Sequence, residues 1–112
     1  MSQMITGLEN QLASTKELVA RRDAALRLHD NRDFKLLMVD GFMRDEAARY
    51  VQASGDPALS AEDRADSLAL AQASGHVKRF LSVVVVMGNQ AARDVGALQE
   101  ALDEERANEG QE

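Results

Sequence analysis

Apolar positions recur every three or four residues along the first quarter of the chain. This first stripe consists of Ile5, Leu8, Leu12, Thr15, Val19, Arg22 and Leu26. Alternating steps of three and four are typical of a helix that pairs with another helix along one stripe. We therefore predict a helix over residues 3–29, with Thr15 and Arg22 as polar interruptions of its stripe.

The second half of the chain carries a longer stripe with the same spacing. Its members are Leu70, Ser74, Val77, Leu81, Val84, Gly88, Ala91, Val95, Leu98 and Leu102. Because the register continues through Gly88, it predicts one helix over residues 61–108, with a helix end at Gly88 as the alternative. The valine run at residues 83–86 alone would suggest a strand, but it lies within this helical register.

Two clusters of helix-breaking residues separate three helices. Gly55 is expected to end a helix in the left-handed conformation, and Asp56-Pro57 to begin a turn. Ser60, followed by acidic residues in the first turn, predicts the N-cap of the last helix. Asp30 or Asn31 can cap a middle helix, which we place at residues 32–53.

The middle helix is apolar on two sides, so it is expected to have two partners. One stripe holds Phe34, Leu37, Met38, Gly41 and Ala48, and the other holds Leu36, Val39, Met43 and Tyr50. Antiparallel pairing after the turn would place Gly41 opposite the region around Gly75. Because glycine is unfavourable inside helices, this opposed pair predicts a close helix crossing, with merely tolerated glycines as the alternative.

The predicted fold is all-α: three helices in one domain, residues 1–112, forming an elongated helical hairpin or bundle with coiled-coil-like seams and a long C-terminal helix. Continued antiparallel pairing would set Leu26, Val19 and Leu12 opposite Gly88, Val95 and Leu102. Two arrangements satisfy this pattern. Either the first two helices cover the third, or a compact bundle leaves the end of the third helix to pair with another copy. Both predict a homo-oligomer or a larger assembly, since long seams with few aromatic residues make a weak monomer.

Composition and charge narrow the class of protein. The absence of cysteine excludes disulfides, thiolate metal sites and cysteine nucleophiles. No apolar run is long enough to cross a membrane, and the N-terminus lacks signal-peptide features, which predicts a cytoplasmic protein. Of the formal net charge of −6, residues 89–112 contribute −5, from two basic and seven acidic residues. No basic face is apparent, so direct nucleic-acid binding is not expected.

Candidate catalytic and metal-binding groups are sparse. His29 and His76 lie far apart and lack ligand partners at helical spacing, and the serines form no nucleophile motif. We predict no catalytic, cofactor or metal site and no small-molecule substrate. The predicted interaction residues are instead the seam positions Ile5, Leu8, Leu12, Val19, Leu26, Val95, Leu98 and Leu102. The acidic tail, residues 103–112, is assigned to solvation.

A family resemblance lies in the segment NRDFKLLMVDGFMRDEAAR, residues 31–49, followed by the Asp56-Pro57-Ala58-Leu59-Ser60 turn. It resembles small, mostly uncharacterised helical proteins encoded among the morphogenesis genes of tailed bacteriophages, over roughly residues 5–85. The chain departs from that pattern at Arg32, where a proline is expected. The resemblance implies a virion-associated or assembly role without catalysis, with other virion proteins as partners, in the host cytoplasm and then in the virion.

Two other functions stay open on the residues alone. The chain could be a small acidic phage protein that binds and inhibits a host protein, with the acidic C-terminus as the recognition element. It could also be a bacterial cytoplasmic coiled-coil adaptor.

Overall fold

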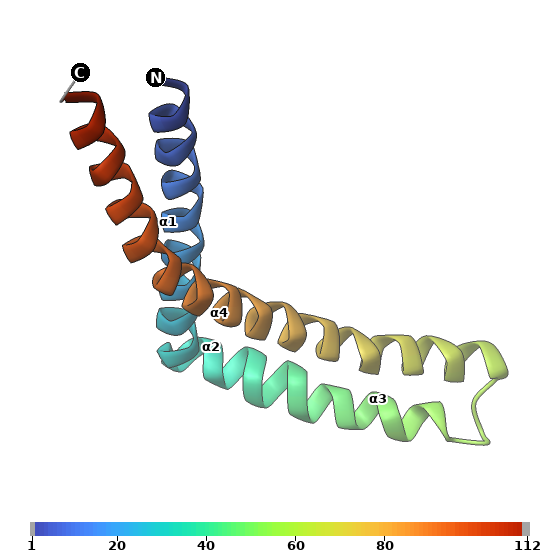
Figure 1. Ribbon diagram of the computed structural model, residues 1–112. Coiled ribbons are helices and arrows are strands. Elements are labelled where there is room, and N and C mark those ends of the chain that lie inside the picture. The colour runs from blue at the N-terminus through green and yellow to red at the C-terminus, as the bar shows by residue number, and fades with distance from the viewer. Residues whose placement is uncertain (1, 111–112) are drawn as a thin grey trace. The chain divides into compact units, whose positions relative to one another are not determined.

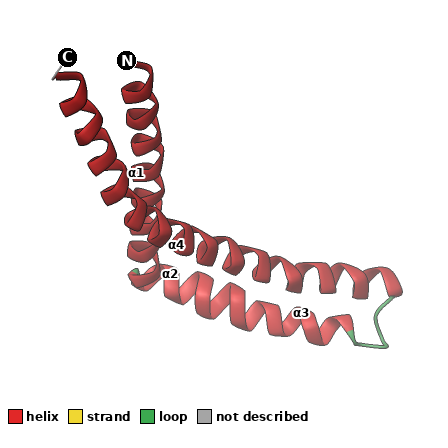
Figure 2. Ribbon diagram, viewed as in Figure 1, coloured by secondary structure: helices red, strands yellow, loops and turns green. Residues whose placement is uncertain are grey.

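A computed structural model describes residues 2–110, and three helical segments account for almost all of them (Figures 1 and 2). The first is α1 (Ser2–Asp30) and the last is α4 (Ala61–Gly110). The middle segment consists of α2 (Arg32–Phe34), η1 (Lys35–Glu46) and α3 (Ala47–Ser54). No strand occurs within residues 2–110. The prediction of an all-α fold with three helices and a long C-terminal helix is confirmed, and the valine run is helical.

Local capping explains where the middle and last helices begin. The Asn31 side chain accepts a hydrogen bond from the Phe34 amide at 2.9 Å, and Ser60 Oγ accepts one from the Asp63 amide at 3.0 Å. Each bond satisfies an amide that lacks a partner within its own helix. Between the helices, Asp56 Oδ1 accepts a hydrogen bond from the Ala58 amide at 2.9 Å and orders the turn.

Gly55 ends α3 in a way that differs from the prediction. Its φ is −105° and its ψ is 4°, so it does not adopt the left-handed conformation. The Gly55 amide donates instead to the Gln52 carbonyl at 3.1 Å, which closes the helix with a tighter turn. A left-handed glycine is therefore not needed to reverse the chain here.

The chain divides into two compact units. Unit 1 comprises Met1–Ala25 and Val84–Glu112, and unit 2 comprises Leu26–Val83. Helices α1 and α4 each contribute to both units. The assignment of residues 1–112 to one domain stays a prediction.

Unit 1 is an antiparallel pair formed by the first part of α1 and the last part of α4 (Figure 1). Leu12, Ala91 and Leu102 are buried between the two helices. Near the first turns of α1, Arg106 Nη2 donates to Glu9 Oε1 at 3.0 Å across the pair. One chain therefore supplies both sides of this seam.

Unit 2 is a helical hairpin in which the middle segment returns through the 55–60 turn to lie along the first part of α4 (Figure 1). Its central part, η1, is a π-helix. The Ala47 amide directly after it donates to the Phe42 carbonyl, five residues earlier. A π-helix of 12 residues is unusual, since most π-helical segments are single-turn insertions.

Candidate functional site

The predicted seam residues occupy the interior of unit 1, with one exception. Leu12 and Leu102 are buried, and the half-buried members are Ile5, Leu8, Val19, Val95 and Leu98. Val19 and Val95, which the antiparallel prediction paired, line the same small pocket. Leu26 is 45% exposed. The seam residues are thus brought together within a single chain, apart from Leu26.

Arg22, rather than Leu26, occupies the seam opposite Gly88. Its Nη1 donates to Asn89 Oδ1 at 3.2 Å, and its Nε and Nη2 donate to Asp23 Oδ1 at 3.1 and 3.0 Å. The guanidinium is therefore satisfied at the edge of the seam, as a partly buried charge requires. The predicted pairing of Leu26 with Gly88 is wrong by one helical turn.

Gly88 marks the closest helix crossing in unit 1. A Cβ placed on Gly88 would overlap the Arg22 Cβ and would lie 3.0 Å from the Leu18 carbonyl oxygen. Both atoms belong to α1, so the two helix backbones approach each other where Gly88 has no side chain. The adjacent buried residue on α4, Ala91, is also small.

The predicted close crossing at Gly41 and Gly75 is wrong. A Cβ on Gly75 would meet nothing within 4 Å. A Cβ on Gly41 would meet only the Leu36 carbonyl oxygen, 3.2 Å away in the same helix. Gly41 therefore relieves crowding inside the wide turn of η1 instead of admitting a neighbouring helix. The sequence prediction placed the close approach in unit 2, whereas the glycine with another helix against it, Gly88, lies in unit 1.

One detail of the α4 stripe also differs from the prediction. Leu70 is exposed, whereas Ala71 is half-buried and Ser74 is buried. Ser74 Oγ donates to the Ala71 carbonyl at 2.9 Å, which satisfies the buried hydroxyl within its own helix. The stripe thus shifts by one residue near the start of α4.

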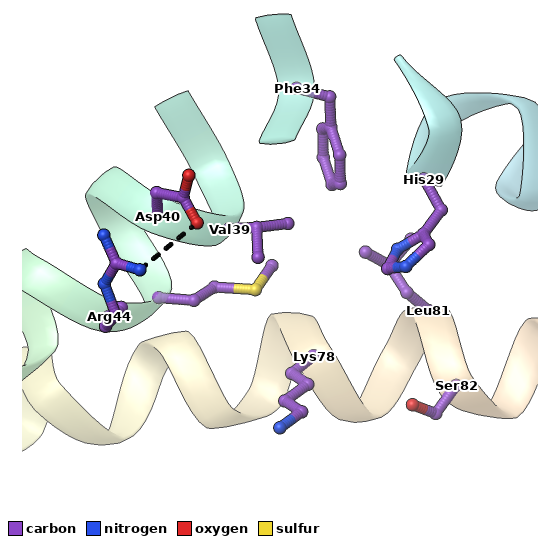
Figure 3. Close-up of a pocket in the computed structure, with 9 residues that line it drawn as sticks. His29, Phe34, Val39, Asp40, Arg44, Lys78, Leu81 and Ser82 are labelled. Atoms are coloured by element: carbon purple, nitrogen blue, oxygen red, sulfur yellow. Dashed lines mark ion pairs between the residues drawn. The ribbon is translucent and has the colours of Figure 1, made fainter. Parts of the chain in front are cut away.

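Unit 2 contains a pocket of about 480 Å³ between the middle segment and α4. Its apolar lining consists of Phe34, Val39, Met43 and Leu81. Figure 3 shows Phe34 and Val39 pointing toward α4 and the His29 ring beside Leu81. Lys78 and Ser82 lie along the α4 edge. The volume falls in the range of small ligand pockets.

A second pocket, of about 360 Å³, adjoins the first because Asp40 lines both. Its other lining residues are Asp30, Arg32, Lys35 and Leu36. We call the two pockets together the basic groove, because four basic residues line it against two acidic ones. The basic residues are Arg32, Lys35, Arg44 and Lys78, and the acidic residues are Asp30 and Asp40.

One of the four basic residues of the basic groove, Arg44, is held in ion pairs. Arg44 pairs with Asp40 at 3.5 Å and with Asp45 at 3.0 Å. The hydrogen bond to Asp45, followed by the charges of Asp45 and Asp40, raises the pKa of Arg44. Within residues 2–110, Arg32, Lys35 and Lys78 form no ion pair. The lining of the basic groove therefore keeps three basic side chains that are not paired with carboxylates of the described residues.

No group of three or more potential metal ligands is found among the described residues. Within the same range, no helix is long and apolar enough to span a bilayer. The predicted absence of catalysis and of cofactors stays a prediction.

Comparisons of the chain with family models, with curated proteins and with solved structures found no match. The resemblance to phage morphogenesis proteins therefore stays a prediction from the quoted residues.

Proposed function

We propose that the chain is a non-enzymatic phage structural or assembly protein that acts by helix–helix association within the virion. The observation that supports it best is the exposure of Leu36 and Leu37, which are 62% and 67% exposed on η1. Two adjacent exposed leucines on a helix are typical of a surface that a partner covers.

The location of the interface follows from what each unit buries. Unit 1 already covers its seam within the chain, so the seam residues are not free to bind another copy. Unit 2 contributes most of the exposed large apolar residues in the described range. They are Leu26, Leu28, Leu36, Leu37, Val51, Leu68, Leu70 and Phe80. The middle helix was predicted to need two partners, and α4 supplies one of them. A second copy or another virion protein is proposed as the other.

Self-association is tested by sedimentation of the purified protein over a range of concentrations. The wild type is expected to form an oligomer, and Leu37→Asp is expected to shift the protein toward monomer because a charge would enter the interface. Ala24→Asp adds the same charge at an exposed position of unit 1 and serves as the control. A wild type that stays monomeric at every concentration contradicts the proposal.

The virion role is tested separately by mass spectrometry of purified particles. The protein is expected in particles at a fixed ratio to the other structural proteins. Its presence only in the soluble fraction of infected cells would contradict the virion role.

A second candidate is an inhibitor that binds a host protein through its acidic end. The observation that favours it is the charge of unit 1, which holds 10 acidic and 5 basic residues, a net of −5. Stoichiometric binding of one host protein, lost on Glu100→Lys and Glu104→Lys substitution, would favour this function over the structural one.

A further inference from the structure

We infer that copies of this chain associate head to tail, with the acidic end of α4 from one copy seated in the basic groove of the next. This inference rests on the proposed self-association and specifies its partner surfaces. Both surfaces are formed by described residues of a single chain, and each lies within one unit.

The groove offers an apolar floor with a positive rim. Phe34, Val39, Met43 and Leu81 line the floor of its larger pocket. Arg32, Lys35 and Lys78 are exposed on its rim and form no ion pair within residues 2–110. The groove lining thus holds four basic and two acidic residues in a chain whose formal net charge is −6. The occupant should therefore be negatively charged and partly apolar.

The last part of α4 has this composition on its exposed side. Glu100, Asp103 and Glu104 are exposed there, together with the small residues Ala97 and Ala101. Alanine at the contact would let the helix backbone approach the groove, while the carboxylates could reach the basic rim. Glu105, by contrast, is half-buried against the rest of unit 1 and is not available to the same degree.

The two surfaces are different, so the contact is heterologous. A heterologous contact leaves one free groove and one free acidic end in every dimer, so that further copies can add until a ring closes or a filament grows. Rings and filaments of this kind are compatible with the structural role proposed above. The contact also covers Leu36, which lines the smaller pocket of the groove.

The test uses two charge-reversed forms of the full chain and their mixture. The groove variant carries Lys35→Glu and Lys78→Glu, and the end variant carries Glu100→Lys and Glu104→Lys. Since Lys and Glu have similar helix propensities, both variants should keep the wild-type helicity, measured by circular dichroism. Each variant alone is expected to self-associate about tenfold more weakly than the wild type, because two attractive pairs become repulsive.

An equimolar mixture of the two variants should restore association, because each reversed surface meets its reversed partner on the other variant. The direction in which the self-association of the end variant alone changes is also diagnostic. The end variant lowers the magnitude of the net charge from −6 to −2, so general repulsion predicts tighter association, whereas the proposed contact predicts weaker association. A control with Arg27→Glu and Arg79→Glu changes the charge of unit 2 outside the groove and should bind within about twofold of the wild type.

Three results would overturn the inference. Failure of the mixture to associate would show that the acidic end and the groove are not partners in different copies, including the case where they meet within one copy. Tighter association of the end variant would indicate general charge repulsion. If each variant alone associated as tightly as the wild type, self-association would stand but would use other surfaces. A monomeric wild type would overturn the proposed self-association as well.

Discussion

Units 1 and 2 are both built from paired helices, yet they bury their apolar residues to different extents. Unit 1 encloses Leu12, Ala91 and Leu102, whereas the one buried residue of unit 2 within the described range is Ser74. Unit 1 also joins its helices through side chains distant in sequence, Arg106 with Glu9 and Arg22 with Asn89. A pair of helices can thus be self-sufficient in one part of a chain and incomplete in another.

The difference follows from the residues at the contact. In unit 1, Gly88 and Ala91 let the backbones approach, so that one apolar stripe on each helix is covered by the other. In unit 2, η1 is apolar on two sides, and α4 can cover only one. Within η1, the adjacent Leu36 and Leu37 are both exposed. Unit 1 therefore covers its own apolar stripe, and unit 2 leaves more of its large apolar residues exposed, which is why the proposed partner surface lies there.

The largest expected effect is the loss of a buried leucine from unit 1. Leu102 is 2% exposed, so Leu102→Ala should lower the free energy of unfolding by about 2–5 kcal/mol. The matched change in unit 2, Leu37→Ala, should alter the stability of the dilute protein by no more than about 0.5 kcal/mol. Urea unfolding at low protein concentration measures both. Equal losses from the two variants would remove the distinction between the units.

Much of this comparison could be predicted from the sequence, because periodicity reports helices and seams directly. The all-α fold follows from the three-four spacing, and Asn31 and Ser60 cap the helices that the sequence assigned to them. The observed helix ends also lie within two residues of the predicted 3–29, 32–53 and 61–108. Helix positions and helix caps depend on residues close together in the chain, so they can be predicted from a single sequence.

The helix crossing and the groove could not be predicted with the same success, because both depend on winding and register over long distances. The expected crossing at Gly41 and Gly75 is absent, and the close approach lies instead at Gly88 in unit 1. A useful signal was nonetheless present. Gly88 interrupts the apolar stripe of α4, and Arg22 interrupts that of α1. A glycine opposite a long side chain indicates that the two helices approach each other closely. The basic groove could not be predicted from the sequence, since Lys78 comes from α4 and the basic residues of the middle segment alternate with acidic ones.

A smaller effect is expected from adding one methyl group at a glycine in each unit. Gly88→Ala should destabilise the protein by about 1–3 kcal/mol, since its Cβ would overlap Arg22. Gly75→Ala meets open space and should stabilise α4 by up to about 1 kcal/mol through helix propensity. Thermal melts measure the pair. A Gly88→Ala melting temperature at or above that of the wild type would contradict the close crossing in unit 1.

The smallest expected effect concerns an ion pair in unit 2 between two residues that lie one helical turn apart. Arg49 Nη2 donates to Glu46 Oε2 at 2.7 Å, and this hydrogen bond lowers the pKa of Glu46 below its ordinary value. Because the folded pKa lies below the unfolded one, the contribution to stability is present above the unfolded pKa, about 4.3, and is lost as the pH falls through the folded pKa. Both side chains are largely in solvent, so the contribution is small.

Thermal melts of the wild type and Glu46→Gln between pH 3 and pH 7 isolate this contribution. At neutral pH the wild type should melt slightly higher than the variant, and the difference should shrink as the pH falls and Glu46 becomes protonated. The pair joins the end of η1 to α3 within the middle segment, so its loss should leave the contact between α1 and α4 in unit 1 intact. A pH-dependent difference as large as the effect of Gly88→Ala would show that unit 2 contributes far more to the stability of the chain than its sparse burial indicates.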